Sequence, residues 1–141
     1  MNSDPNCIFC KIVSKAIPAS VVYEDEQTLA FMDLGQVNPG HVLVAAKAHA
    51  EDLYGLQDAQ AEAVFRAAAR VARAIRAAFS PEGLSVYQAN GKPAGQTVFH
   101  FHIHLVPRYD GDGMALVWPV KNPARSVLED YAGRIKAKIK A

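Results

Sequence analysis

The sequence predicts an α+β fold in which about five antiparallel strands form one sheet, with one long helix and a second helix near the C-terminus. Three observations support this class: short apolar segments separated by turn residues, one long segment with helical periodicity, and connections that are mostly short. A doubly wound parallel sheet is disfavoured because only one helix separates consecutive strands.

The first three strands are predicted between residues 21 and 45. The segments 21–24 and 28–32 are mainly apolar and flank the polar run Asp25-Glu26-Gln27, which is typical of a β-hairpin. Asn38-Pro39-Gly40 is a strong turn signal. The apolar segment 41–45 that follows it is therefore predicted to be the third strand.

The long helix is predicted to begin after Asp58, a plausible N-cap, and to end before Pro81. Its apolar face has the three-and-four spacing of an amphipathic helix and consists of Ala61, Val64, Phe65, Ala68, Val71, Ala72, Ile75 and Phe79. Arginines at positions 66, 70, 73 and 76 lie off that face. They form either a phosphate-binding ridge or a solvated helix surface, and we favour the second because such surfaces are common.

Two further strands and a C-terminal helix complete the prediction. Residues 84–90 are predicted to be a strand, which the five-residue loop 91–95 joins to a neighbouring strand that begins at His100. Ser126 to Glu129 fits a capping box, and an apolar stripe continues through Leu128, Tyr131, Ile135 and Ile139. Lysines 136, 138 and 140 suit the negative end of that helix, a role favoured over nucleic-acid contact.

Length and composition indicate a single globular domain over residues 1–141, with 50% hydrophobic residues available for a core. The formal charge of +1 gives no argument for a nucleic-acid or membrane partner. Because neither a signal peptide nor an apolar run of membrane-spanning length is evident, we expect a cytoplasmic protein. A reducing compartment disfavours a disulfide between the two cysteines.

Three histidines, His100, His102 and His104, alternate with apolar residues in the segment 99–106. In a strand they would form one row on one face, with neighbours roughly 6.6 Å apart. Phe99, Phe101, Ile103 and Leu105 would fill the opposite face. Imidazole titrates near neutrality and can serve as nucleophile, proton donor or ligand, so the row predicts a chemical site.

Cys7 and Cys10 are separated by two residues, a spacing that lets both sulfurs bind one metal ion. A tetrahedral zinc site needs two more ligands, for which His49 and His100 are candidates. Four protein ligands would make the site structural. A redox role for the cysteines is weaker because no βαβ unit follows them.

Two other groups of residues could contact a phosphorylated ligand. Gly95-Gln96-Thr97 offers backbone N–H groups, an amide and a hydroxyl, which suit phosphate oxygens. Asp33 follows an apolar strand and could hold a ribose hydroxyl, although an acid there is equally often a turn former.

Together these segments closely resemble the histidine triad nucleotide-binding (HIT) family, over most of residues 1–108 and in order. The resemblance is carried by Cys7-Ile8-Phe9-Cys10-Lys11-Ile12, Ile17-Pro18-Ala19, Tyr23-Glu24-Asp25, Ala30-Phe31-Met32-Asp33, Pro39-Gly40-His41-Val42-Leu43-Val44 and Gly95-Gln96-Thr97-Val98-Phe99-His100-Phe101-His102-Ile103-His104-Leu105-Val106-Pro107-Arg108. It thins from Tyr109 onward. The resemblance implies a HIT-like fold.

The resemblance implies hydrolysis or transfer at the α-phosphate of a purine nucleotide conjugate such as a phosphoramidate, an acyl-adenylate or a dinucleoside polyphosphate. His102 would attack phosphorus and form a nucleotidyl-histidine intermediate, which water hydrolyses to release AMP or GMP. A backbone carbonyl should fix its other ring nitrogen. His104 would contact the phosphate and help to protonate the leaving group, and His41 would support the cluster. The alternative for His41 is a strand-start histidine with no role.

The resemblance also implies ligand contacts. Asp33 would hold the ribose, Asn90 the sugar-phosphate region, and Gln96 and Thr97 the phosphate. The base pocket would be lined by Phe9, Ile12, Phe31 and Leu43, although Phe9 serves equally well as plain core packing.

Structural zinc on Cys7, Cys10, His49 and His100 and a homodimer are implied in the same way, whereas no catalytic metal is implied. Trp118 and Pro119 would either reach the partner's active site or close the core. Two other function classes remain as alternatives: a nucleotide-sensing or adaptor protein with negligible turnover, and a zinc-stabilised nucleic-acid module, which the near-neutral charge disfavours.

Overall fold

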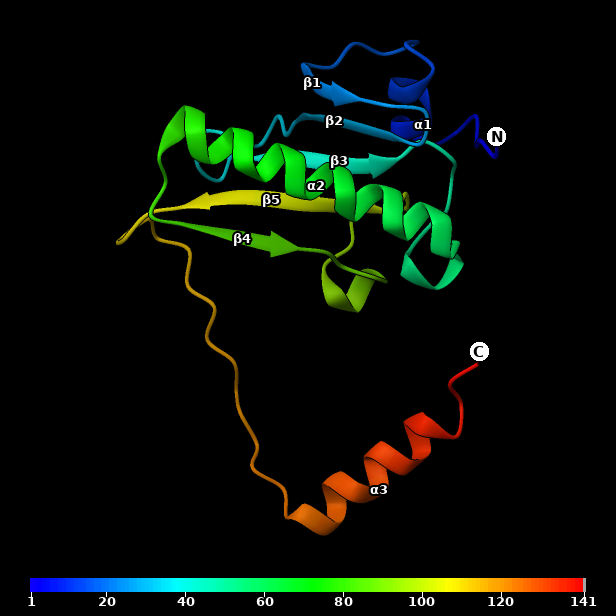
Figure 1. The fold of residues 1–141 in the computed structure, drawn as a ribbon, viewed down its shortest axis with the longest axis vertical. Coiled ribbons are helices and arrows are strands. Elements are labelled where there is room, and N and C mark those ends of the chain that lie inside the picture. The colour runs from blue at the N-terminus through cyan, green and yellow to red at the C-terminus, as the bar shows by residue number, and fades with distance from the viewer. Residues whose placement is uncertain (141) are drawn as a thin grey trace.

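The computed structural model, which describes residues 1–140, has one five-stranded antiparallel sheet with the strand order β1-β2-β3-β5-β4 (Figure 1). The strands are β1 (Val21–Glu24), β2 (Thr28–Met32), β3 (Val42–Ala46), β4 (Gly83–Tyr87) and β5 (His102–Arg108). The α-helices are α1 (Ile8–Val13), α2 (Asp58–Phe79) and α3 (Arg125–Lys136), and short 3₁₀ helices cover Leu53–Gly55 and Lys92–Ala94. The predicted α+β class is confirmed.

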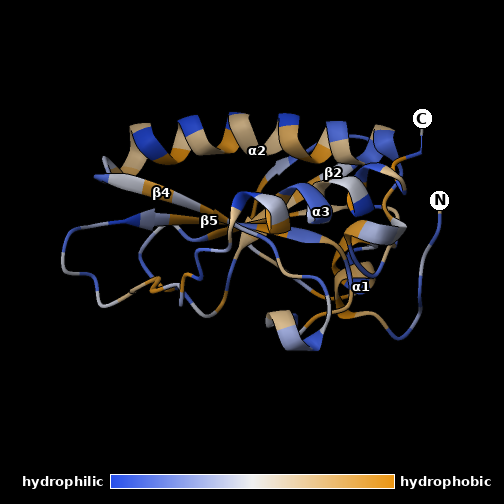
Figure 2. Ribbon diagram, turned by 90° about the horizontal axis from the view of Figure 1, so that it is seen from below, coloured by the Kyte–Doolittle hydropathy of each residue, from blue (hydrophilic) through white to orange (hydrophobic). Residues whose placement is uncertain are grey.

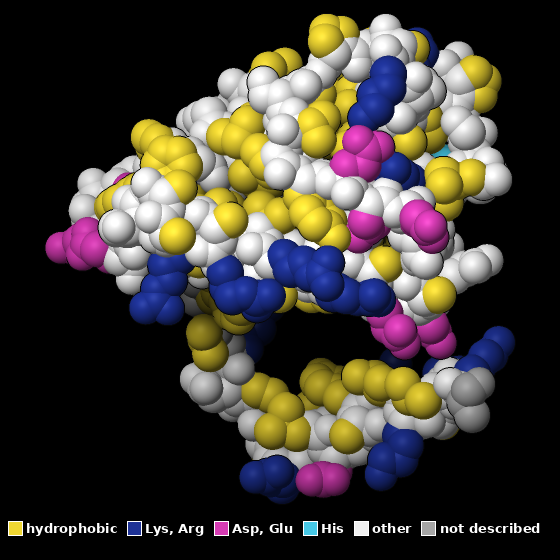
Figure 3. Space-filling view, turned by 45° about the horizontal axis from the view of Figure 1, so that its top comes forward, with side chains coloured by type: hydrophobic (Ala, Val, Ile, Leu, Met, Phe, Trp, Pro, Cys, Tyr) yellow, Lys and Arg dark blue, Asp and Glu magenta, His cyan; other side chains and the backbone are white. Residues whose placement is uncertain are grey.

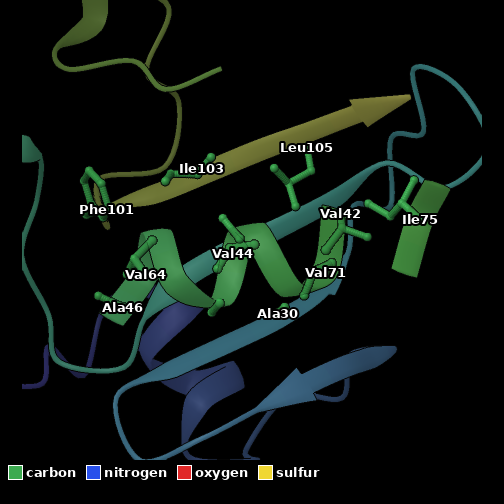
Figure 4. Close-up of a cluster of buried hydrophobic side chains, with 12 residues drawn as sticks. Ala30, Val42, Val44, Ala46, Val64, Val71, Ile75, Phe101, Ile103 and Leu105 are labelled. Atoms are coloured by element: carbon green, nitrogen blue, oxygen red, sulfur yellow. The ribbon is translucent and has the colours of Figure 1, made fainter. Parts of the chain in front are cut away.

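Helix α2 lies across one face of the sheet, and the main core is between them. Figure 2 shows the apolar side of α2 turned toward the strands. In the close-up, Val64 and Val71 of α2 face Val44 of β3 and Ile103 of β5 (Figure 4). Alternate residues of β5 therefore point to this core, as period-two alternation requires.

The opposite face of the sheet is covered by α1 and the chain around it. Phe9 and Ile12 of α1 pack with Phe31 and Leu43, and Cys7 and Cys10 belong to the same buried cluster. His102 and His104 point to this face, because Ile103 and Leu105, which alternate with them, belong to the α2 core. The sheet thus separates an apolar core from a face that carries the imidazoles.

Helix α2 differs from the prediction in its cap and in its buried face. Gln57 is the N-cap and its backbone N–H donates to Oε1 of Gln60 at 3.0 Å, whereas Asp58 is already helical. Phe65 is 56% exposed and Phe79 is 46% exposed, so both predicted core aromatics lie at the margin of the contact with the sheet. The fully buried positions are Ala63, Val64, Ala67, Ala68, Val71 and Ile75. Phe65 therefore lies beside the buried stripe, and Phe79 packs next to Gly40 at the C-terminal end of α2. The arginines at 66, 70, 73 and 76 are exposed.

The strands around the triad are shorter than predicted. Strand β4 ends at Tyr87, and β5 begins at His102, so His100 is not part of a regular strand and Phe99 is 46% exposed. The reason is visible at Phe101, whose N–H donates to the Ala50 carbonyl at 2.7 Å instead of to a neighbouring strand. A single row of three strand histidines is therefore wrong: two lie on β5 and His100 precedes it.

Residues 113–140, here called the C-terminal arm, leave the body formed by residues 1–112 (Figure 1). The predicted C-terminal helix exists as α3, but its N-cap is Ala124, with no side-chain cap, so the Ser126 capping box is wrong. Every described residue of α3 is exposed, and Figure 3 shows a row of apolar side chains along it. Trp118 is 75% exposed and does not close the core of its own chain. Within the described residues, no helix is both long and apolar enough to cross a membrane.

Candidate active site and metal centre

The centre of the candidate site is formed where β3, β5 and β4 lie side by side. Antiparallel pairing places His104 opposite Leu43 of β3 and Tyr87 of β4, and His102 opposite Ala45. The His102 and His104 rings lie with their centroids 5.1 Å apart, and Phe9 packs edge-on against His102 at 4.9 Å. The register of the strands therefore fixes the His102 and His104 imidazoles next to each other on the same face of the sheet.

His102 has one ring nitrogen occupied and one available. Its Nδ1 lies 2.6 Å from the carbonyl oxygen of His100, which can only accept a hydrogen bond. The neutral ring therefore carries its proton on Nδ1, and Nε2 keeps a lone pair. A backbone carbonyl was predicted at this position, and the structure places one there.

His41 and His104 form a hydrogen-bonded pair next to Asp33. His41 Nε2 lies 2.9 Å from His104 Nδ1, and Asp33 Oδ2 lies 3.4 Å and 3.8 Å from the same two nitrogens. The Val37 N–H donates to His41 Nδ1 at 3.3 Å, so the His41 proton belongs on Nε2 and is donated to His104. This leaves His104 with its own proton on Nε2, ready for donation. Asp33, His41 and His104 also lie close enough to one another to form a second group of potential cation ligands.

Burial keeps these imidazoles neutral. It lowers the pKa of His41 and of His102 below the ordinary value, against the opposing effect of the Asp33 carboxylate. The pKa of His104 falls to about 4, first through burial and then through the neighbouring imidazoles. A neutral imidazole keeps the lone pair that a nucleophile or a proton acceptor needs.

Four donor atoms meet beside this site, from Cys7, Cys10, His49 and His100. Cys7 Sγ and Cys10 Sγ lie 3.3 Å and 3.6 Å from His100 Nδ1, and His49 Nδ1 lies 3.4 Å from Cys10 Sγ and 3.3 Å from His100 Nδ1. Ligand atoms that surround zinc as a tetrahedron, each at the typical distance of roughly 2.0–2.3 Å from the ion, lie about this far from one another. All four predicted metal ligands are thus brought together.

The protonation of His100 supports a cation at the centre of these four atoms. Its Nε2 lies 2.6 Å from the Ala46 carbonyl oxygen and must donate to it, so Nδ1 presents a lone pair to the two sulfurs and to His49. Burial raises the pKa of the Cys7 thiol, and a cation bound beside the sulfur would offset that effect. The donor set therefore fits zinc.

His100 links the two sites. Its imidazole is one of the four clustered donors, while its carbonyl oxygen accepts the hydrogen bond from His102. One residue outside the regular strand thus contributes to both.

A cleft of about 250 Å³ opens beside His102 and His104. Six of the eight residues predicted to bind substrate line it: Phe9, Ile12, Phe31, Asp33, Leu43 and Thr97. One end is apolar and aromatic and the other holds the imidazoles and a carboxylate, which suits a ligand with a flat base and an anionic group.

The other two predicted contacts, Gln96 and Asn90, do not line this cleft. Gln96 is buried, and its amide accepts from the Gly91 N–H at 2.7 Å and donates to the Glu51 carbonyl at 2.6 Å. The Asn90 side chain accepts from the Leu53 N–H at 2.7 Å. In this structure both amides hold together the loops that border the site.

Sequence reasoning missed the side chain that holds the turn carrying His41. The side-chain oxygen of Gln36, Oε1, accepts from the backbone N–H groups of Gly40 and His41, both at 3.0 Å. The side-chain Nε2 of Gln36 donates to the backbone carbonyl of His41 at 2.7 Å. A glutamine in a polar loop gives no periodic signal. The segment Ile17-Pro18-Ala19 also lines the cleft, and its only signal in the sequence was the family resemblance.

Comparison with known proteins agrees with this site. The family model described as the HIT domain matches residues 14–111. Protein hit of Bacillus subtilis is 50% identical over 119 residues, which cover 84% of this chain and 82% of that protein. Adenosine 5′-monophosphoramidase hnt1 of Schizosaccharomyces pombe is 34% identical over 136 residues, 96% of this chain and 99% of that protein.

Solved structures show the same fold. The crystal structure of a HIT family protein from Bacillus anthracis superposes with a TM-score of 0.94 at 42% identity, covering 98% of this chain and all of that one. A Zn-bound histidine triad family protein from Mycobacterium smegmatis has a TM-score of 0.74 at 33% identity, covering 95% of this chain and 98% of that one. With the family model matched over most of its length and its triad in place, this chain belongs to the HIT domain family.

Proposed function

We propose that the protein hydrolyses or transfers the nucleotidyl group of purine nucleotide conjugates by attack of His102 on the α-phosphorus. The observation that carries the proposal is the 2.6 Å hydrogen bond from His102 Nδ1 to the His100 carbonyl, which leaves a lone pair on Nε2 of a side chain that lines the cleft. Relatives in fission yeast and in Candida albicans are named adenosine 5′-monophosphoramidases. Phosphoramidates are therefore the first substrates to test, with acyl-adenylates and dinucleoside polyphosphates next.

The reaction has two displacements. In the first, the Nε2 lone pair of His102 forms the N–P bond as the bond to the leaving group breaks; the leaving group takes up a proton from solvent, and His104 Nε2–H donates a hydrogen bond to it. In the second, water attacks phosphorus, the N–P bond breaks, and the proton that water loses is released to solvent. The covalent intermediate divides one difficult step into two easier ones.

Recognition is proposed to follow the polarity of the cleft. Phe9, Ile12, Phe31 and Leu43 would enclose the base, Asp33 would accept from ribose hydroxyls, and Thr97 would donate to the phosphate. Gln96 and Asn90 would act on the phosphate and the sugar through the loops that they hold.

We further propose structural zinc on Cys7, Cys10, His49 and His100, because the unprotonated Nδ1 of His100 faces the other three donors. Zinc would join the N-terminal segment to the loops that carry the two histidines. All four positions are filled by protein ligands, so the ion would have no open position for substrate. No catalytic metal is proposed.

A homodimer in the cytoplasm is proposed as the working form, and the arm is proposed to be an extension of one domain over residues 1–141 and not a second domain. The proposed partner is a nucleotide conjugate and not a nucleic acid or a membrane, because HIT relatives are named for nucleotide substrates or for nucleotide binding.

Comparing His102→Ala with the parent protein tests the proposed function. With adenosine phosphoramidate as substrate, the variant should lose AMP release and retain most of its AMP affinity in calorimetry. Arg66→Ala, on the exposed side of α2, is the matched control and should hydrolyse the substrate at the parent rate. Turnover that survives in His102→Ala would overturn the mechanism. A parent protein that binds AMP without turning over any of the three substrate classes would favour the adaptor alternative.

A further inference from the structure

One residue from each of four neighbouring strands belongs to a single row that crosses the sheet. Phe31 of β2 is paired with Leu43 of β3, and Leu43 is paired with His104 of β5. On its other side, His104 is paired with Tyr87 of β4. Directly paired residues point to the same face of a sheet, and neighbouring strands lie roughly 4.8 Å apart. The row therefore crosses the face that carries the imidazoles.

The row has a buried end and an open end. Phe31 and Leu43 are buried and line the cleft beside His104, whereas Tyr87 is 42% exposed and does not line that cleft. The Tyr87 ring packs edge-on against His104, with the ring centroids 5.8 Å apart. His104 thus has the cleft on one side and an exposed aromatic ring on the other.

The Tyr87 ring is fixed at both of its ends. The backbone of β4 holds one end, and the hydroxyl at the other end donates to the Ala94 carbonyl at 3.1 Å. Ala94 ends the 3₁₀ helix that precedes Gly95, and a Cβ on Gly95 would lie 3.5 Å from the Tyr87 hydroxyl oxygen. Because the hydroxyl already bonds to this loop, the ring and not the hydroxyl is available to a ligand.

The proposed reaction assigns a different part of the substrate to each part of the row. The base would lie over Phe31 and Leu43. The leaving group would start beside His104, whose Nε2–H donates a hydrogen bond to it. Since the base occupies the β3 side of His104, the leaving group extends toward β4 and over the ring of Tyr87.

We propose that Tyr87 forms the floor of a leaving-group subsite that favours flat, uncharged groups. This inference rests on the proposed function and names the residue that selects among its substrates. An aromatic ring offers an apolar face for stacking, and its negative face attracts cations and not anions. Amine and acyl leaving groups that carry a ring should therefore fit the subsite better than the polyphosphate chain of a dinucleoside polyphosphate.

Two adenosine phosphoramidates that differ only in the leaving amine test the subsite. Benzylamine carries a ring, whereas 2-methoxyethylamine has nearly the same basicity and no ring, so the chemistry at phosphorus is comparable. The value of kcat/KM for AMP release is measured for both substrates, and the ratio of the two values isolates the contribution of the ring. The parent protein should favour the benzylamine substrate by roughly 3- to 10-fold.

A matched pair of variants separates the ring of Tyr87 from its hydroxyl. Tyr87→Phe and Tyr87→Leu both remove the hydrogen bond to Ala94, and only the second removes the ring. Tyr87→Phe should keep the preference of the parent protein, whereas Tyr87→Leu should hydrolyse the two substrates equally well. Damage to the loop or to His104 would slow both substrates alike and would cancel in the ratio.

The outcomes distinguish the subsite from the proposed function. Tyr87 lies outside both buried clusters, so both variants should fold like the parent protein, and their affinity for AMP verifies this. A parent protein without the preference, or a Tyr87→Leu variant that keeps it, would overturn the subsite and leave the proposed hydrolysis intact. A parent protein that hydrolyses neither substrate would contradict the proposed function and the subsite with it.

Discussion

Replacing Cys7 by serine should remove the zinc-dependent part of the stability and little else. The two side chains are similar in size, and Cys7 is buried against the N-terminal cluster, so the fold itself changes little. What is lost is one of four donor atoms that all lie within 4.8 Å of one another. Three remaining ligands would hold zinc far more weakly.

The magnitude follows from linkage. A ligand that binds only the folded state stabilises it by about 2.7 kcal/mol when its free concentration is a hundred times its dissociation constant. For a domain of this length each kcal/mol moves the melting temperature by roughly 3 °C, so loss of zinc should lower it by about 8 °C.

The assay is thermal unfolding followed by circular dichroism, with and without a chelator. The melting temperature of the parent protein should fall by that amount when the chelator is added. Cys7→Ser should have the lower melting temperature from the start, and the chelator should not change it. A chelator effect of equal size in both proteins, or none in the parent, would refute the assignment. So would purified parent protein with less than about half an equivalent of zinc when no chelator was used.

Three further predictions concern the body. The pKa of His104 is about 4 in the folded chain and 6.5 ordinarily, so the unfolded chain takes up a proton at a higher pH than the folded chain does. The free energy of unfolding, measured with urea, should therefore fall as the pH drops from 6.5 toward 4. The fall should be less steep in His104→Gln. Gln96→Ala leaves the Gly91 N–H and the Glu51 carbonyl without their partner and should cost about 1–3 kcal/mol in the same assay; an unchanged midpoint would contradict its loop-holding role. Ile103→Ala opens a cavity between β5 and α2 and should cost about 2–5 kcal/mol, whereas a loss below 1 kcal/mol would mean that this core collapses around the change.

The sequence was sufficient to predict an antiparallel sheet of five strands, because the signals for each strand are local. The hairpin at residues 21–32 follows from a polar turn between apolar segments, and both strands begin and end where predicted. Helix α2 follows from periodicity over 22 residues. These patterns depend on neighbours along the chain and need no knowledge of tertiary contacts.

The predictions are wrong where tertiary contacts, and not the local sequence, determine the structure. His100 continues the alternation in the sequence, yet it lies outside β5 because the Phe101 N–H donates to the carbonyl of Ala50, a residue far away in the sequence. Period alone could not show that α2 would meet the sheet through alanines and leave Phe65 outside. The apolar stripe of α3 was predicted correctly, but no local pattern could show that α3 lies apart from the body of its own chain.

The candidate site was predictable in its chemistry and less so in its contacts. Histidines and cysteines carry strong signals, and the structure brings the four metal candidates together and places His41, His102 and His104 in one cluster. Amides such as Gln96 and Gln36 can bond to a ligand or to a loop, and only the folded structure shows which of these they do.

The stereochemistry at phosphorus tests the central claim most directly. A substrate with a chiral, isotopically labelled α-phosphorus is hydrolysed, and the configuration of the released nucleoside monophosphate is determined. Attack by His102 followed by attack by water inverts the centre twice, so the configuration should be retained. Inversion would show a single direct displacement by water and would contradict the nucleophilic role of His102.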